Sequence, residues 1–582
     1  MSDIVHIERR PGIDSLPEWA GELHPVLARV YASRAVRSGT ELDGSLARLL
    51  PFEGLYDIHR AVDLLVEALE GQWRILIVGD FDADGATSSA LAVRALRELG
   101  AAEVDFLVPN RFEYGYGLTP EIVAVATAAN GAPAQLLITV DNGISSVAGV
   151  AAAREAGMRV LVTDHHLAGS QLPDADAIVN PNRPEDGFAS KALAGVGVIF
   201  YVLMALRVRL RERGWFERRG LDEPNLARHL DLVALGTVAD VVPLDANNRI
   251  LVAQGLARIR AGQACPGIQA LLEVGGRDPA MTVAADLGFA VGPRLNAAGR
   301  LEDMSVGIAC LLSDDVGEAR ALAARLDGLN RERRAIEDDM KARALAHIEE
   351  VLEAEEGELP VGLCLYDADW HEGVVGLLAS RIKDRLHRPV IAFAPGGGSD
   401  QLKGSARSVS GLHIRDALDA VATRHPALLS KFGGHAMAAG LTIRREDFDA
   451  FARAFDAEVR RHLDPAALRG AVLSDGALGP ADHSLDLAEA LRFAGPWGQG
   501  FPEPVFDGVF DLIQRRIVGE RHLKLVVRHP EGGPPLDAIA FNVTDADWPA
   551  AVSRVRLAYR LDVNSFRGQR SVQLIVVHLE LV

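Results

Sequence analysis

Four short apolar runs alternate with alanine-rich segments in the first third of the chain. The runs are Ile75–Gly79, Val104–Val108, Leu136–Val140 and Val160–Thr163, and the segments between them are Thr87–Leu99, Pro120–Ala129 and Ile144–Ala156. This alternation is typical of βαβ units, which build a parallel sheet covered by helices. Because ligands of such sheets bind beyond the carboxyl ends of the strands, functional residues are expected directly after the apolar runs.

Carboxylates and imidazoles occupy those positions. Asp80, Asp82 and Asp84 follow the first run on alternate positions, Asp141-Asn142-Gly143 follows the third, and Asp164-His165-His166 follows the fourth. Neighbouring carboxylates repel each other and raise their own pKa values unless a cation neutralises them. We therefore expect the loops to converge on a metal site.

Each motif also has a simpler interpretation. Asp-x-Asp-x-Asp-Gly opens the calcium loop of helix-loop-helix proteins, but the closing position holds Leu91 where that loop needs Glu, and the preceding run is strand-like. Asp141-Asn142-Gly143 alone indicates a turn, and Asp164-His165-His166 alone a helix cap. Three such motifs after successive strands are hard to explain as turns.

Length and charge limit the function. A chain of 582 residues predicts three to five domains at roughly 100 to 200 residues each. The net charge of −19 argues against passive coating of nucleic acid, although the stretch from Asp511 to Arg570 carries ten Lys and Arg against seven Asp and Glu. Three scattered cysteines exclude a disulfide framework and a zinc ribbon.

The sequence predicts a cytoplasmic protein that does not contact membranes. Residues 1–11 lack the apolar core of a signal peptide, and the longest apolar run, Leu193–Leu206, is shorter than the roughly 18 residues that span a bilayer.

Composition divides the chain into five predicted parts. The long segment from Val316 onward has no proline and predicts a connecting helix, a second strand and helix pattern follows, and the last part holds many short strands. The parts are a segment over 1–70 packing on the core, a catalytic α/β domain over 71–315, the connecting helix over 316–357, a second α/β domain over 358–465 and a nucleic-acid-binding barrel of the OB type over 466–582.

Motifs along most of the chain resemble those of one family. They are Gly79–Ser88, Val140–Gly143, Asp164–His166, Ala239–Leu244, Gly292–Leu301, His371–Gly376, Gly404–Ser408, Gly433–His435 and Pro496–Pro504. The set resembles the DHH phosphoesterases and, among them, the RecJ-type exonucleases specific for single-stranded DNA, from about Gly71 to the end of the chain. The resemblance implies a DHH domain and a DHH-associated domain joined by a long helix, followed by the barrel.

The resemblance also implies site residues. It makes Asp82, Asp84, Asp141, His165 and Asp240 metal ligands, with Asp80 and His166 at the ions or just behind them, and Asp82, Asp84, Asp141, His165, His166 and Asp240 the catalytic set. Substrate binding falls to Arg111, Arg294, Asn296, His371, Ser405, Arg407 and His435. A pair of Mn²⁺ ions, with Mg²⁺ as the alternative, suits the mixed carboxylate and imidazole ligands. For any one arginine a salt bridge is the competing interpretation, and His371 is equally suited to cap a turn.

The implied function is 5′ to 3′ degradation of single-stranded DNA to nucleoside 5′-monophosphates in recombination and repair, by a monomer. A single-strand-binding protein and a RecQ-type helicase are the expected protein partners. No Ser or Cys nucleophile is needed, and no Gly-x-x-x-x-Gly-Lys loop indicates a helicase. The alternatives are a DHH phosphodiesterase acting on short oligonucleotides or cyclic dinucleotides, and a replication scaffold that keeps the fold without chemistry.

Overall fold

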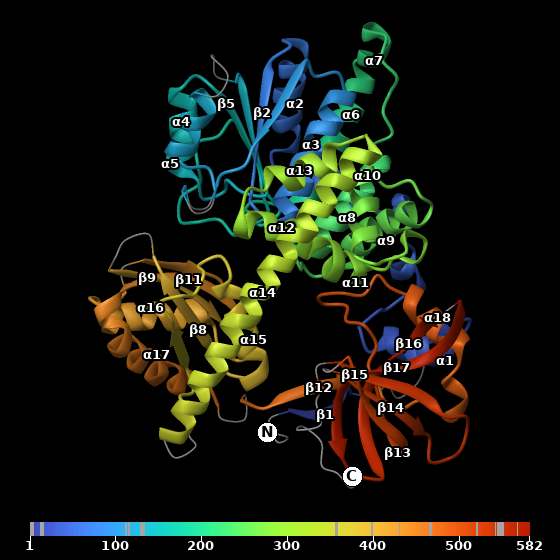
Figure 1. Cartoon of the computed structure of the whole chain (residues 1–582). Helices are drawn as coiled ribbons and strands as arrows, with labels where there is room; N and C mark the ends of the chain where they lie inside the picture. The colour runs from blue at the N-terminus through green and yellow to red at the C-terminus, as the bar shows by residue number, and fades with distance from the viewer. Residues whose placement is uncertain are drawn as a thin grey trace. The chain divides into compact units, whose positions relative to one another are not determined.

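The computed structural model of the chain divides into two compact units (Figure 1). The first unit contains Ile13–Asn330 and Asp486–Pro504, and the second contains Met1–Gly12, Arg331–Leu485 and Val505–Val582. The structure describes residues 5–11, 17–110, 113–114, 117–128, 134–354, 359–396, 400–429, 431–464, 468–519, 522–541, 543, 552–566 and 568–582.

A parallel sheet forms the centre of the first unit. Its strands run in the order β3-β2-β4-β5-β6. They are β2 (Arg74–Gly79), β3 (Glu103–Leu107), β4 (Leu136–Val140), β5 (Arg159–Thr163) and β6 (Ala177–Val179). The four apolar runs in the sequence thus lie side by side, with β2 and β4 at the centre, because strands buried on both faces need near-continuous apolar sequence.

Helices cover both faces of this sheet. Figure 1 shows α4 (Pro120–Ala128) and α5 (Val147–Glu155) on one face and α2 (Ile58–Glu70), α3 (Ala83–Glu98) and α6 (Gly195–Glu212) on the other. The core on the α4 and α5 face includes Ile122, Val150 and Val160. The α/β arrangement predicted from the sequence is confirmed.

A helical subdomain follows the sheet. Its helix α8 (Leu230–Ala239) packs against α3 and α9 (Ala246–Arg260). The others are α7 (Trp215–Arg219), α10 (Pro266–Val274), α11 (Ala284–Asp286), the π-helix η7 (Leu287–Val291), α12 (Gly292–Leu301) and α13 (Ser305–Leu312). The N-terminal helix α1 (Pro25–Ala32) also belongs to this unit, as does most of α18 (Leu485–Phe493).

Helix α14 (Val316–Ala354) is 39 residues long, and the division between the two units falls within it. The predicted domain boundaries at 315 and 357 stay predictions.

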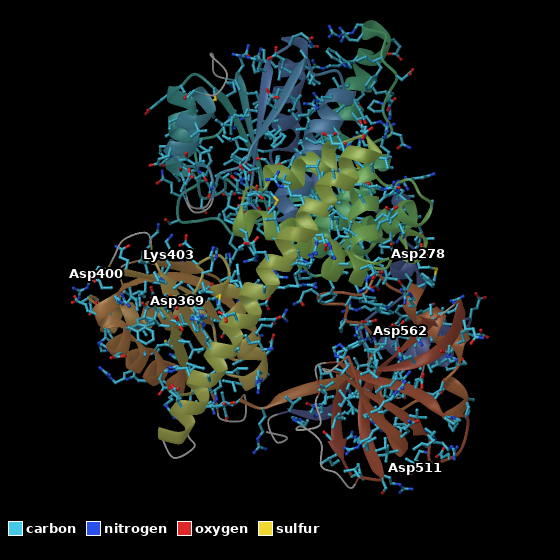
Figure 2. The ribbon with its side chains drawn as sticks, in the orientation of Figure 1. Asp278, Asp369, Asp400, Lys403, Asp511 and Asp562 are labelled. Carbon is cyan, nitrogen blue, oxygen red and sulfur yellow. The ribbon has the colours of Figure 1, made fainter. Side chains whose placement is uncertain are left out.

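The second unit holds a mixed five-stranded sheet in the order β10-β11-β9-β8-β7. The strands are β7 (Leu363–Tyr366), β8 (Val390–Pro395), β9 (Gln401–Arg407), β10 (Lys431–Gly434) and β11 (Ala438–Arg444), and the helices are α15 (Val375–Leu386), α16 (Ile414–Arg424) and α17 (Phe448–His462). Only the β7 and β8 pair is parallel, since the short β8 to β9 and β10 to β11 connections return the chain antiparallel. Asp369, Asp400 and Lys403, which are labelled in Figure 2, belong to this domain.

A closed barrel completes the second unit, with the strand order β13-β14-β15-β17-β16. The strands are β13 (Phe506–Val518), β14 (His522–Arg528), β15 (Leu536–Phe541), β16 (Arg554–Phe566) and β17 (Gln569–Leu581). Asp511 and Asp562, labelled in Figure 2, lie on β13 and β16. A five-stranded closed barrel in this connectivity is the OB architecture expected from the sequence.

A small two-stranded sheet joins the N-terminal segment of the second unit to the segment before its barrel. Strand β1 (Val5–Arg9) pairs in parallel with β12 (Gly470–Ser474). No helix in the described part of the chain is long and apolar enough to cross a membrane.

Candidate metal centre

The acidic loop after β2 is tied to the helix that follows it. Asp82 is the N-cap of α3, and its Oδ1 accepts hydrogen bonds from the backbone N–H groups of Asp84 and Gly85 at 3.0 Å each. A Cβ at Gly85 would lie 2.4 Å from the carbonyl oxygen of Asp80, so only glycine lets the loop close this tightly. The loop therefore brings three carboxylates to one turn.

Asp84 points into the protein. Its side chain is 1% exposed, and its two oxygens accept hydrogen bonds from Gly195 N (2.6 Å) and Val196 N (3.0 Å). Both donors lie in the first turn of α6, where the helix dipole and orphan N–H groups favour an anion. The start of α6 thus holds Asp84 in place, a role that its apolar sequence did not indicate.

The loop after β4 holds a second carboxylate in a constrained conformation. Asp141 has a φ of 61°, and Gly143 has a φ of 114° with no room for a Cβ beside Thr139 Oγ1. Asn142 donates from Nδ2 to the carbonyls of Val78 (3.0 Å) and Val140 (2.9 Å), which ties the ends of β2 and β4 together. The backbone bends at Asp141, which is buried at this point.

Asp164 organises the loop after β5. Its Oδ1 accepts from the backbone N–H groups of His165 (2.7 Å) and His166 (3.1 Å) and lies 2.8 Å from Nδ1 of the His166 ring, while its Oδ2 accepts from Ile144 N (2.9 Å). A carboxylate on one ring nitrogen fixes the orientation of the imidazole and leaves Nε2 for other chemistry. The sequence motif contains Asp164 but did not indicate this supporting role.

Three groups of donor atoms cluster where these loops meet the end of α8. Within each group the atoms lie within 4.8 Å of one another. The groups are Asp80, Asp82 and Asp141; Asp84, His165 and Asp240; and Asp141, His165 and His166. The structure thus brings together all seven residues that the sequence predicted at the metal site.

The contacts inside this cluster fit metal ligands better than hydrogen-bonded pairs. His165 Nε2 lies 3.1 Å from Asp141 Oδ1 and 3.5 Å from Asp240 Oδ2. Neither of these buried oxygens accepts a hydrogen bond from the residues that the structure describes. Buried carboxylates without donors are costly, and a shared divalent cation satisfies them.

The pKa values of the clustered side chains also indicate a bound cation. Burial, followed by repulsion from neighbouring carboxylates, raises the pKa values of Asp84 and Asp141 well above the ordinary value, and burial with repulsion from Asp82 raises the pKa of Asp240 to about 7. Burial opposes the charge of His166, but the Asp164 carboxylate outweighs it and raises the pKa of His166 to about 9. A bound cation would restore the carboxylates to their charged state.

Two predicted substrate residues on α12 make contacts within the first unit. Arg294 is 8% exposed, forms an ion pair with Asp327 at 2.8 Å and donates to the carbonyl of Ala290. Asn296 accepts from the backbone N–H of Ala83 at 2.8 Å and so supports the acidic loop. These contacts favour the salt-bridge interpretation of Arg294, with the difference that the bridge is buried.

The other predicted substrate residues that the structure describes lie in the second unit. A Cβ at Gly376, in the first turn of α15, would lie 2.9 Å from Arg407 Nη2 and 3.0 Å from Ser405 Oγ, so both polar groups approach the start of that helix. Burial lowers the pKa of Arg407. His371 Nδ1 accepts from Gly373 N at 3.1 Å and caps the turn before α15. His435 is exposed after Gly434, and Arg111 lies outside the described residues.

One face of the barrel carries basic, acidic and apolar side chains, and Lys524 on this face forms an ion pair with Asp537 at 3.0 Å. Residues of β14 alternate between a buried side, with Leu523 and Leu525, and an outer side, with His522 and Lys524. The ladder pairs His522 with Phe541, which is 51% exposed and lies 5.2 Å from the His522 ring between centroids. It also pairs Lys524 with Arg516 on β13 and with Ile539 on β15. Proteins that bind single-stranded nucleic acid commonly use aromatic and cationic side chains on adjacent strands.

Comparison with known proteins defines the class. The family model of the DHH family, N-terminal domain, matches residues 74–237, the DHHA1 domain model matches residues 360–461, and the RecJ OB domain model matches residues 474–578. Fold, acidic site and domain order therefore define a DHH-family protein with a DHHA1 domain and an OB barrel.

Relatives narrow this class further. The chain is 58% identical to "Single-stranded-DNA-specific exonuclease RecJ" of Escherichia coli (strain K12) over 98% of both chains. It superposes on the crystal structure of RecJ from Thermus thermophilus in complex with Mn²⁺ with a TM-score of 0.80 and 33% identity, covering 100% of this chain and 80% of that one. The corresponding Mg²⁺ complex gives a TM-score of 0.75 at 31% identity, covering 100% of this chain and 79% of that one. The chain belongs to the RecJ family.

Proposed function

We propose that the chain is a metal-dependent exonuclease that degrades single-stranded DNA from its 5′ end to nucleoside 5′-monophosphates. The convergence of five Asp and two His side chains, from the segments after β2, β4 and β5 and from the end of α8, carries the proposal, because such a cluster serves phosphodiester hydrolysis by divalent ions. Relatives named as single-stranded-DNA-specific exonucleases support the substrate class.

The acidic cluster would hold Mn²⁺ or Mg²⁺. We assign Asp82, Asp84, Asp141, His165 and Asp240 as ligands of two ions, with Asp80 and His166 at the ions or directly behind them. When bound, the ions supply an activated water and neutralise the non-bridging phosphate oxygens. Structures of a relative with Mn²⁺ and with Mg²⁺ support both metals.

The residues of the chain prepare this site before substrate arrives. The start of α6 fixes Asp84, the strained turn fixes Asp141, and Asp164 fixes the ring of His166 through Nδ1. Rigid placement of ligands avoids a reorganisation cost during reaction. Carboxylate and imidazole groups therefore act here as ligands and positioning groups, and none is required as a covalent nucleophile.

Ser405 and Arg407 are proposed to bind the terminal 5′ phosphate. Their approach to the first turn of α15 supports this assignment, since helix N-terminal N–H groups and a guanidinium both favour phosphate oxygens. His371, His435 and Arg111 are proposed as further contacts to the strand by resemblance. The outer barrel face with Arg516, Lys524 and Phe541 is proposed to hold the strand.

The family resemblance supports a wider setting, which we also propose. The protein acts as a cytoplasmic monomer in recombination and repair, and a single-strand-binding protein and a RecQ-type helicase supply its substrate.

End-labelled substrates test the function. Single strands of 20 nucleotides carrying a label at the 5′ or the 3′ end are digested with Mn²⁺, with Mg²⁺ and with EDTA. The proposal expects immediate release of 5′-labelled mononucleotide with either metal and none with EDTA. Early release from the 3′ label contradicts the polarity, and faster turnover of a dinucleotide than of the 20-mer favours the small-substrate phosphodiesterase.

A further inference from the structure

Three large apolar side chains stand exposed in the first unit, two of them in segments that carry metal-site residues. Phe289 is 75% exposed, Val241 62% and Leu167 60%, the highest values among the large apolar side chains described in the first unit. Leu167 directly follows the Asp164–His166 motif, and Val241 directly follows Asp240. Single exposed apolar residues are common, so a function needs further support.

The backbone at two of these positions is unusual. Phe289 is the central residue of the π-helix η7, a rare conformation that occurs frequently at functional sites. Val241 has a φ of 63°, which a β-branched residue rarely adopts. The fold therefore maintains an apolar side chain in solvent at a position where glycine would cost less.

Two of the three segments meet through metal-site residues. His165 Nε2 lies 3.5 Å from Asp240 Oδ2, and Leu167 and Val241 follow these residues by two positions and one.

The π-helix reaches the same region by packing on α8. A Cβ at Gly288 would lie 3.3 Å from Val238 Cγ1, three residues before Val241. Helix α12, which continues from η7, supports the acidic loop through Asn296 and Ala83. Leu167 and Val241 thus lie directly beside metal-site residues, and Phe289 lies on the π-helix that packs against α8. We call these three side chains the apolar rim.

We propose that the apolar rim contacts the bases of the strand whose phosphodiester lies at the metal centre. The inference rests on the proposed exonuclease function and names contacts for the base side of its substrate. Carboxylates and ions at the centre match the phosphate, whereas the π-faces of bases match exposed Phe, Val and Leu. Such contacts accept every base, and they favour single strands because duplex bases are already paired and stacked.

Variants at the most exposed positions test the rim. Phe289→Ala and Leu167→Ala should each raise the KM for a 5′-phosphorylated 20-mer, by roughly 5-fold to 100-fold at Phe289. Phe289→Trp should restore the KM, because it keeps an aromatic face. The high exposure of Phe289 leaves little packing to lose, so thermal unfolding should not change. Leu221→Ala, at another exposed apolar residue of the first unit, is the matched control.

A strand without bases makes the test specific. A 20-mer with abasic sites at its first three nucleotides should bind the wild-type protein more weakly by a similar factor, and Phe289→Ala should add no further loss. If Phe289→Ala and Leu167→Ala both keep the wild-type KM, the rim does not contact bases. An equal loss on intact and abasic strands also overturns the inference, since the side chain then acts on the fold or the backbone.

The proposed exonuclease function and the proposed base contacts of the apolar rim can be tested separately. If the wild-type protein cleaves no single strand with Mn²⁺, the proposed function fails. Fluorescence anisotropy with labelled intact and abasic 20-mers in EDTA then tests the rim without turnover. Tighter binding of the intact strand that disappears in Phe289→Ala supports the rim, and equal binding of the two strands overturns it.

Discussion

The imidazole of His165 places Nε2 3.1 Å from Oδ1 of Asp141, yet that oxygen accepts no hydrogen bond from the described residues. The two side chains come from loops after neighbouring parallel strands. A nitrogen and an oxygen that approach closely without a hydrogen bond between them are arranged as ligands of a common metal ion.

Asp141→Asn should abolish cleavage and spare the fold. We expect turnover to fall at least about 100-fold, because an amide is a weaker ligand for a divalent ion than a carboxylate. The substitution also removes a buried negative charge whose pKa is raised by burial and by neighbouring carboxylates. In EDTA the variant should therefore unfold at the wild-type temperature or higher, and Mn²⁺ should stabilise the variant less than the wild type. Full activity in the purified variant would show that Asp141 is not a ligand.

Most residues of this site could be predicted from the sequence, because the side chains that carry its chemistry come directly after predicted strands. Asp80, Asp82 and Asp84 come after an apolar run, and the topology of a parallel sheet brings such positions to one edge. Backbone partners were not predictable in the same way. The N–H groups of Gly195 and Val196 bind Asp84 from a distant apolar helix whose side chains carry no chemical signal.

Other features depend on tertiary context. The partner of Arg294 is Asp327, on a helix that the sequence indicated only as a connector. The π-helix at Leu287–Val291 has no sequence signature comparable to a cap or a turn. The paired strands β1 and β12 are separated by most of the chain, so local periodicity could not join them.

Asp164 should act through His166. Asp164→Asn keeps the shape but weakens the contact to Nδ1, so the ring loses its fixed orientation. We expect turnover to fall about 10-fold to 100-fold and the Mn²⁺ concentration for half-maximal activity to rise. The metal titration is the decisive measurement, because a purely structural loss would lower activity without moving the midpoint. Asp174→Asn, at an exposed surface ion pair, serves as the control.

Asp507 should make the free energy of unfolding depend on pH in the acid range. Its buried carboxylate accepts from Arg9 Nε (2.8 Å), Ser474 Oγ (2.6 Å) and Arg556 Nη2 (3.1 Å). Burial alone would raise the pKa of Asp507, but these donors hold it below the ordinary value. The contribution to stability is thus complete above the unfolded pKa of about 4 and is lost as pH falls through the lower folded value.

Urea unfolding of the second unit, followed as a function of pH, measures this effect. Asp507→Asn should cost about 2 to 4 kcal/mol at pH 7, since it leaves four donor atoms of three residues with a weaker acceptor. The difference from the wild type should shrink below pH 4, where the wild-type carboxyl also takes up a proton. Asp511→Asn, which removes a more exposed ion pair with Arg554, should cost less than about 1 kcal/mol. A difference that stays constant down to pH 2 would rule out the titration of Asp507 as the cause.

Gly376→Ala should disturb recognition of the 5′ phosphate without unfolding the domain. The new methyl group would lie 2.9 Å from Arg407 Nη2 and 3.0 Å from Ser405 Oγ. Both atoms lie on side chains that can move away, so the backbone is expected to survive while the two groups lose their positions at the start of α15. The KM for a 5′-phosphorylated 20-mer should rise roughly tenfold, as expected for the loss of one or two charge-assisted hydrogen bonds.

The 5′-hydroxyl 20-mer separates phosphate recognition from general damage. If Ser405 and Arg407 bind the terminal phosphate, Gly376→Ala and Arg407→Ala should bring the KM for the 5′-phosphorylated 20-mer toward the KM for the 5′-hydroxyl 20-mer. Gly328→Ala, on α14 with open space around its Cβ position, is the control and should keep the preference. A rise of KM by the same factor on both strands would contradict the assignment, because the loss would then not involve the terminal phosphate.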